Sequence, residues 1–141
     1  MTIANFYPNC VEYSKTMPSV LIVDDAAFSR RMLRKYAEAE GCTVLEAGSG
    51  KDAIALLARQ YPDCILTDLL MPDINGFELI ETLQEKGLTI PIVIISADIQ
   101  DASRERGKAL GASGFINKPA KEAEVRQTLR QLIESSRKPQ L

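Results

Sequence analysis

The sequence predicts an α/β protein with a doubly wound parallel sheet that is covered by helices on both faces. Three observations indicate this class. Short apolar runs alternate along the chain with segments whose apolar residues recur at helical spacing. The runs are almost continuously apolar, which is typical of strands buried on both faces of a parallel sheet. The length of 141 residues suits a single domain with one fold.

The first two strand–helix units cover residues 19–60. The run "SVLIVDD" at 19–25 predicts a buried strand that ends in two aspartates, and a helix is expected over 26–41, where Gly41 stops it. The second strand is expected at 42–47 and the second helix at 49–60. The apolar residues that share one helical face are Phe28, Met32, Leu33 and Tyr36 in the first helix and Ile54, Leu57 and Ala58 in the second.

Three further units follow the break at Tyr61-Pro62. Their strands are expected at 63–68, 92–97 and 113–117, and their helices at 76–87, 99–110 and 121–136. The inward-facing residues are Phe77, Ile80 and Leu83 in the third helix and Val125, Leu129, Leu132 and Ile133 in the fifth. Before the third helix, Asn75-Gly76 predicts a turn in which the glycine is free to take a positive φ.

Right-handed crossovers between five parallel strands favour the flavodoxin-like order 2-1-3-4-5. The folded domain is therefore expected over residues 19–136. Residues 1–18 show no periodicity and predict a flexible extension, and residues 137–141 predict a short tail. We expect no second domain after residue 141.

Composition excludes several classes of function. The net charge of −2 and the pI near 5.2 give no overall attraction to nucleic acid or to an anionic membrane. No apolar run is long enough to span a bilayer, and the N-terminus does not resemble a signal peptide. The three cysteines lack pair spacing, so a cytoplasmic location is expected. The chain has no histidine, which excludes Ser-His-Asp catalysis and histidine-ligated zinc.

Polar residues follow the strands at the edge where such sheets bind ligands. The first strand ends in Asp24-Asp25, the third in Asp68, the fourth in Ser96-Ala97 and the fifth in Asn117-Lys118-Pro119. Three carboxylates brought together need a counter-charge, which Mg²⁺ and a lysine ammonium would supply. A phosphoryl group arriving at one of the carboxylates would then be stabilised by both cations, while Ser96 could donate a hydrogen bond to it and Ala97 leaves room for it.

Four motifs carry a family resemblance, and they occur in order at the expected separations: "LIVDD", "ILTDLLMPDINGFEL", "PIVIISA" and "GASGFINKP". From residue 18 to about residue 136, the chain resembles a response-regulator receiver domain, the phosphorylated module of two-component signalling. Each motif alone is weak, and the four together are specific.

The resemblance implies a role for each site residue. Asp68 would be the phosphoacceptor. Asp25 would bind Mg²⁺ directly, and Asp24 would be its companion, acting largely through water. Asp68 would also belong to the metal site, and the backbone carbonyl of Leu70 would complete it. Lys118 would contact the phosphoryl group, and the Lys118-Pro119 peptide bond would be cis.

The resemblance also implies a switch and residues that tune it. Ser96 would be the switch hydroxyl and Phe115 the aromatic switch. Leu70 and Asp98 occupy the positions that control how water reaches the acyl phosphate. Because Leu70 should exclude water and Asp98 should repel or position it, we expect a long-lived phospho-form.

The implied function is a phosphorylation-dependent switch of a two-component or phosphorelay system. A sensor histidine kinase or a histidine phosphotransfer protein would phosphorylate Asp68, and the face formed by the fourth helix, fifth strand and fifth helix would then bind a protein target. The protein would be a stand-alone, chemotaxis-like regulator, a monomer or a weak phosphorylation-dependent dimer. It would be no enzyme beyond its own phosphorylation and slow autodephosphorylation.

Other interpretations remain open at this point. Asp24 or Asp25 could cap the helix that follows, and Phe115 could equally be a core residue. A phosphatase with an aspartyl nucleophile is a second functional class, although Leu70 stands where such enzymes need an acid. A non-phosphorylated adaptor is a third. The segment "GSGK" is not a nucleotide-binding loop, because Asp52 follows it and Ser49 predicts a helix start.

Overall fold

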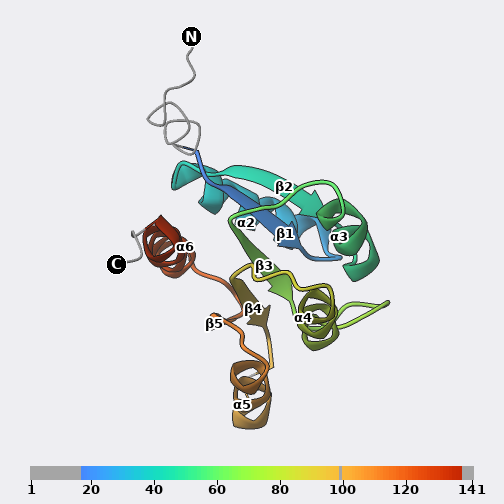
Figure 1. Cartoon of the computed structure of the whole chain (residues 1–141). Helices are drawn as coiled ribbons and strands as arrows, with labels where there is room; N and C mark the ends of the chain where they lie inside the picture. Colours follow the sequence, from blue (N-terminus) through green and yellow to red (C-terminus); the bar gives the residue numbers. More distant parts are fainter. Residues whose placement is uncertain (1–16, 99, 138–141) are drawn as a thin grey trace.

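The computed structural model describes residues 17–98 and 100–137. Five parallel strands form one sheet in the order β2-β1-β3-β4-β5, which confirms the predicted order (Figure 1). The strands are β1 (Ser19–Val23), β2 (Thr43–Ala47), β3 (Cys64–Asp68), β4 (Ile92–Ser96) and β5 (Gly114–Asn117). The chain therefore reverses its direction across the sheet between β1 and β3, and ligands bind at such a position in this class of fold.

Each strand is followed by a helix within the described ranges. The helices are α2 (Ala27–Ala39), α3 (Gly50–Leu57), α4 (Gly76–Glu85), α5 (Asp101–Ala109) and α6 (Glu122–Arg137). Residues 1–16 of the expected extension and 138–141 of the expected tail lie outside the described residues, so both remain predictions. Among the helices of the described part, none combines the length and the apolar character needed to cross a membrane.

Local signals explain where the helices begin and end. α2 ends before Gly41, whose φ of +87 favours glycine. Ser49 caps α3 by accepting a hydrogen bond from the backbone N–H of Asp52, as the sequence predicts. Asn75 caps α4 in a reciprocal capping box with Glu78.

Two apolar clusters lie on opposite faces of the sheet, because alternate residues of each strand point to opposite sides. One cluster packs under α3 and α4, and it includes Leu21, Val23, Ile65, Leu79 and Leu83. The other packs under α2 and α6, and it includes Val20, Ile22, Leu33, Val125 and Leu129. The sheet is thus buried on both faces, as the apolar runs predict (Figure 1).

Two residues do not follow the usual meaning of their sequence patterns. Phe28 is 72% exposed and not part of the core, because it lies in the first turn of α2, beyond the last residue of β1. Gly76 does not have a positive φ. A Cβ at Gly76 would lie 3.0 Å from the carbonyl oxygen of Asp68, so the glycine allows α4 to begin close against the end of β3.

Candidate functional site

Three acidic side chains come together at the carboxyl ends of β1 and β3. Asp24 and Asp25 follow β1, and Asp68 is the last residue of β3. Because β1 and β3 are paired neighbours in the sheet, their ends lie side by side. One carboxylate oxygen from each of the three residues lies within 4.8 Å of the others. This is the cluster that the strand ends predict.

Asp24 is buried and held on several sides. Its backbone N–H donates to the carbonyl of Ala47 at 3.1 Å. Its carboxylate accepts from the backbone N–H of Ala26 at 2.9 Å and pairs with the Lys118 ammonium at 3.3 Å. The N-cap residue of α2 is Ala26, and no side chain caps this helix. The interpretation of the two aspartates as simple helix caps is therefore wrong.

Asp25 and Asp68 differ in their surroundings. Asp25 is exposed, and its carboxylate has no hydrogen-bond or ion-pair partner among residues 17–98 and 100–137. Asp68 is largely buried, with 12% of its side chain exposed, and lies 3.4 Å from the Lys118 ammonium. Burial raises the pKa of Asp68 above its usual range, and the neighbouring Asp24 charge adds to this, while Lys118 acts in the opposite direction.

Lys118 reaches the two acids from the far side of β4. Its ammonium lies 3.3 Å from Asp24 and 3.4 Å from Asp68, so it bridges β1 and β3. Its backbone N–H donates to the carbonyl of Ser96 at 2.8 Å, which fixes the end of β5 against β4. The Lys118-Pro119 peptide bond is cis, the isomer that the resemblance implies.

The end of β4 carries the expected hydroxyl. Ser96 is buried, and its Oγ accepts a hydrogen bond from the backbone N–H of Asp98 at 3.0 Å. Ala97 is exposed. The Asp98 carboxylate accepts from the backbone N–H of Gln100 and from the hydroxyl of Ser103, and the bond from Ser103 holds the pKa of Asp98 below its usual range. Asp98 is thus engaged at the start of α5.

The segment between β3 and α4 is fixed at both ends. The backbone N–H of Leu69 donates to the carbonyl of Ile95, and its own carbonyl accepts from Gly76. The next residue, Leu70, has a side chain that is 69% exposed. The Asp73 carboxylate accepts from the backbone N–H groups of Gly50 and Lys51 at the start of α3. These bonds hold the segment in place, and the two donors to Asp73 lie more than 20 residues earlier in the sequence.

Phe115 lies in β5 and is half-buried against the cluster under α3 and α4. The guanidinium of Arg104 lies 4.9 Å from the centre of its ring, within the range of a cation–π contact. Arg104 also donates to the side chain of Asn117 at 2.8 Å. One side of the Phe115 ring therefore packs against the core, and the Arg104 guanidinium covers another side.

Two residues beside the acids were not identified as site residues from the sequence. Arg30 donates to the backbone carbonyl of Asp24, and it is one of several arginines in α2. Its role depends on the partner Glu46 in β2, which helical spacing cannot identify. Phe28 lines a cavity with Lys118 and Pro119 although it fits an apolar helical face. Its position three residues after Asp25 was the one feature of the sequence that could have indicated its place beside the site.

The residues fit a hard divalent cation. Three carboxylates oppose one ammonium, which leaves an excess of negative charge at the strand ends. Carboxylate oxygens are the ligands that Mg²⁺ prefers, and Asp25 offers one that no protein group occupies among the described residues.

Comparisons with known proteins agree with this geometry. A sequence model of the response regulator receiver domain matches residues 20–130. Protein PilH of Pseudomonas aeruginosa is 33% identical over 119 residues, which cover 83% of this chain and 98% of PilH. The transcriptional regulatory protein ResD of Bacillus subtilis is 40% identical over 106 residues, and the match covers 44% of that protein. The solved structure of chemotaxis protein CheY4 of Vibrio cholerae superposes with a TM-score of 0.77 at 29% identity, covering 82% of this chain and 98% of CheY4.

Proposed function

This chain belongs to the response regulator receiver domain family of two-component signalling, and on this premise we propose that Asp68 accepts a phosphoryl group from a phosphohistidine donor. The donor would be a sensor histidine kinase or a histidine phosphotransfer protein. One observation carries the proposal: the Asp68 carboxylate lies 3.4 Å from the Lys118 ammonium and within 4.8 Å of the carboxylates of Asp24 and Asp25.

The chemistry is a transfer between two nucleophiles. A carboxylate oxygen of Asp68 forms a bond to phosphorus while the bond from phosphorus to the donor imidazole nitrogen breaks, and the imidazole leaves with the electron pair. The Lys118 ammonium stabilises the charge on the phosphoryl oxygens, and the Ser96 hydroxyl donates a hydrogen bond to one of them. Mg²⁺ held by Asp25, Asp24, Asp68 and the carbonyl of Leu70 would neutralise further negative charge at the same place.

The phosphorylated state differs from this structure at Ser96. In this structure the Ser96 hydroxyl oxygen accepts a hydrogen bond from the backbone N–H of Asp98, and a rotation of the side chain towards the phosphoryl group would break this bond. The segment between β4 and α5 then moves, and Phe115 repacks under Arg104. Phosphorylation would shift the equilibrium towards this second conformation, and the face formed by α5, β5 and α6 would then bind a protein target.

The proposal extends to the organisation of the protein. We assign the receiver domain to residues 19–136, which the bounds of β1 and α6 support. Its activity would be limited to its own phosphorylation and slow dephosphorylation, in the manner of a chemotaxis-like regulator. The absence of pair-spaced cysteines from the sequence supports a cytoplasmic compartment. The protein would be a monomer that dimerises weakly, if at all, on phosphorylation.

Incubation with acetyl phosphate and Mg²⁺, followed by intact mass measurement, tests the proposal. We expect the mass of one phosphoryl group on the wild type and none on Asp68→Ala. Asp52→Ala is the matched control, because it removes a carboxylate that lies in α3, outside the cluster. An unmodified wild type, or a gain that Asp68→Ala retains, would overturn the proposal. Multiple turnover of a chromogenic phosphate ester would favour a phosphatase.

A further inference from the structure

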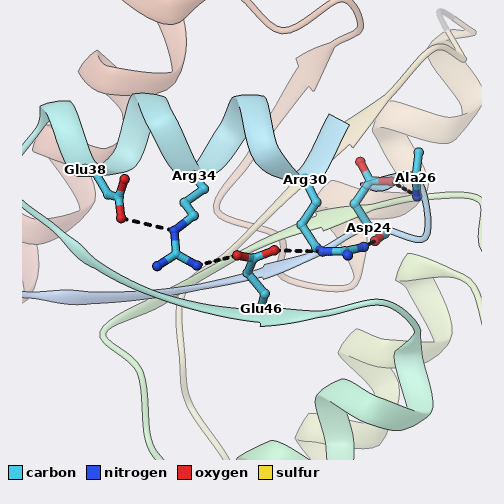
Figure 2. A network of polar contacts seen from close by, with 6 residues as sticks. All are labelled: Asp24, Ala26, Arg30, Arg34, Glu38 and Glu46. Carbon is cyan, nitrogen blue, oxygen red and sulfur yellow. Dashed lines mark hydrogen bonds and ion pairs between the residues drawn. The ribbon is translucent and has the colours of Figure 1, made fainter. Parts of the chain in front are cut away.

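Arg30 connects the acidic cluster to the neighbouring strand. Its guanidinium Nε donates to the carboxylate of Glu46 in β2 at 2.8 Å, and its Nη1 donates to the backbone carbonyl of Asp24 at 2.7 Å (Figure 2). The side chain is only 22% exposed. A planar guanidinium presents its donors in a fixed fork, so one side chain can hold both acceptors at once. Arg30 therefore fixes the position of Asp24 relative to β2.

With Arg30 included, the backbone N–H, the backbone carbonyl and the carboxylate of Asp24 all have hydrogen-bond partners. The N–H donates to Ala47 in β2, the carbonyl accepts from Arg30 in α2, and the carboxylate accepts from the N–H of Ala26. The Ala47 and Arg30 bonds tie the turn to the sheet and the helix. Asp25 lies inside this turn and has no side-chain partner of its own among the described residues. The direction of its carboxylate therefore depends on how firmly the backbone of the turn is held.

We propose that Arg30 is a positioning residue for the divalent-cation site, acting through the backbone of Asp24. It holds the turn that carries Asp24 and Asp25, so that both carboxylates face Asp68 before a cation arrives. The inference rests on the proposed function, because it assigns Arg30 to the same acidic site. Groups that orient metal ligands in this way typically contribute about 10-fold to 100-fold in metal affinity.

Charge and geometry make opposite predictions for Arg30. A guanidinium beside a cation site repels the cation, so by charge alone the removal of Arg30 should tighten Mg²⁺ binding. If Arg30 acts by holding the Asp24 carbonyl, its removal should weaken binding instead. The sign of the change therefore separates the two effects.

Arg34 provides a matched control one helical turn later. It forms an ion pair with the same Glu46 carboxylate and a second one with Glu38, and it does not contact Asp24 (Figure 2). The hydrogen bond from Arg34 holds the pKa of Glu46 below its usual range, and Arg30 acts in the same direction. Arg34→Gln thus removes an equal charge from the same helix and the same network, while the Asp24 bond stays in place.

The test is titration of the full-length protein with Mg²⁺ by isothermal calorimetry, with the wild type, Arg30→Gln, Arg30→Lys and Arg34→Gln. We expect the dissociation constant to rise by about 10-fold in Arg30→Gln. Arg30→Lys keeps the charge and can reach only one of the two acceptors, so we expect weaker binding there too. Arg34→Gln should bind as tightly as the wild type or slightly more tightly.

A second readout is the rate of labelling by acetyl phosphate against Mg²⁺ concentration. The Arg30 variants should need more Mg²⁺ for the half-maximal rate and reach nearly the wild-type rate at saturation, because Arg30 touches neither Asp68 nor the phosphoryl group. A fall in the saturated rate without a change in the Mg²⁺ requirement would contradict the inference.

Three results would overturn the inference: wild-type Mg²⁺ affinity in both Arg30 variants, tighter binding in Arg30→Gln, or equal weakening in Arg34→Gln. Circular dichroism at the titration temperature checks that each variant is folded, and Arg30→Lys is the milder change if Arg30→Gln is not. Calorimetry does not require phosphorylation. A wild type that binds Mg²⁺ but is never labelled would therefore refute the proposed function alone, whereas normal labelling with unchanged Mg²⁺ affinity in the Arg30 variants would refute the inference alone.

Discussion

Two side chains near Asp68 bear on the lifetime of the proposed phospho-form. Leu70 is 69% exposed and offers no hydrogen-bond donor or acceptor that could orient a water molecule. The Asp98 carboxylate already accepts hydrogen bonds from Gln100 and Ser103, so it is held at the start of α5. Neither side chain is arranged to activate water for attack on phosphorus. Both observations favour slow loss of the phosphoryl group.

Replacement of Leu70 by asparagine should shorten that lifetime. The amide can hold a water molecule near the phosphoryl group, and we expect dephosphorylation to become faster by a factor on the order of 10, below the usual effect of a full general base. The measurement is the decay of the phosphorylated mass after removal of acetyl phosphate. Leu70→Met, which stays apolar, should decay like the wild type. An asparagine variant that decays no faster would refute the role of Leu70.

The contact between α2 and α6 depends on one carboxylate. Glu40, at the end of α2, accepts hydrogen bonds from Arg126 and Arg130 of α6 at 2.9–3.0 Å. The bonds from Arg130 and Arg126 lower the pKa of Glu40 to about 2. Because the pKa of Glu40 is lower in the folded than in the unfolded state, its contacts with the two arginines stabilise the fold fully above about pH 4.5. This stabilisation is lost as the pH falls towards 2.

Glu40→Gln should therefore destabilise the protein in a pH-dependent way. At pH 7 we expect a loss of about 1 kcal/mol in the free energy of unfolding, since the arginines are partly exposed. The difference from the wild type should shrink as urea unfolding is repeated at pH values from 5 down towards 2. Glu38→Gln, which breaks only an exposed pair within α2, should have little effect. A Glu40 effect that is constant with pH would show that the charge of Glu40 is not the cause.

The junction of β3 and α4 depends on the missing side chain of Gly76. A Cβ there would lie 3.0 Å from the Asp68 carbonyl oxygen and 3.3 Å from the Leu69 Cα, and these backbone atoms cannot move aside. We expect Gly76→Ala to lower the free energy of unfolding by about 2 kcal/mol, measured with urea. Gly114→Ala is the control, because its Cβ would meet only Val93 side-chain atoms at 3.5 Å or more. Equal stability of the two variants would refute the steric explanation.

These examples show which features the sequence could predict. The strand order follows from buried apolar runs and handed crossovers, and the meeting of Asp24, Asp25 and Asp68 follows from that order. Arg30 could not be identified, because its two acceptors lie in different elements that only the packed fold brings together. Phe28 fits an apolar helical face, and only the position of the first turn of α2 beyond β1 explains its exposure.

At the scale of the whole molecule, the fold concentrates negative charge where the sheet reverses its strand order. The chain has a net charge of only −2, yet three carboxylates lie together against one ammonium at the ends of β1 and β3. Folding brings these like charges together, and their repulsion lowers the stability of the folded state relative to the unfolded chain. A cation that binds the cluster should therefore stabilise the whole domain, because the unfolded chain does not offer this site.

The unfolding equilibrium should accordingly depend on Mg²⁺. A cation that binds only the folded state raises the free energy of unfolding by about 2.7 kcal/mol when its concentration is 100 times the dissociation constant. Urea unfolding with and without MgCl₂ measures this, with NaCl of matched ionic strength to account for screening and EDTA to reverse the effect. Asp25→Asn should remove most of the gain, because Asp25 contributes a carboxylate that no described protein group engages. An equal gain in NaCl or in Asp25→Asn would mean that the three carboxylates do not act as one cation site, and the Lys118 ammonium would then be the one counter-charge left beside Asp68 among the described residues.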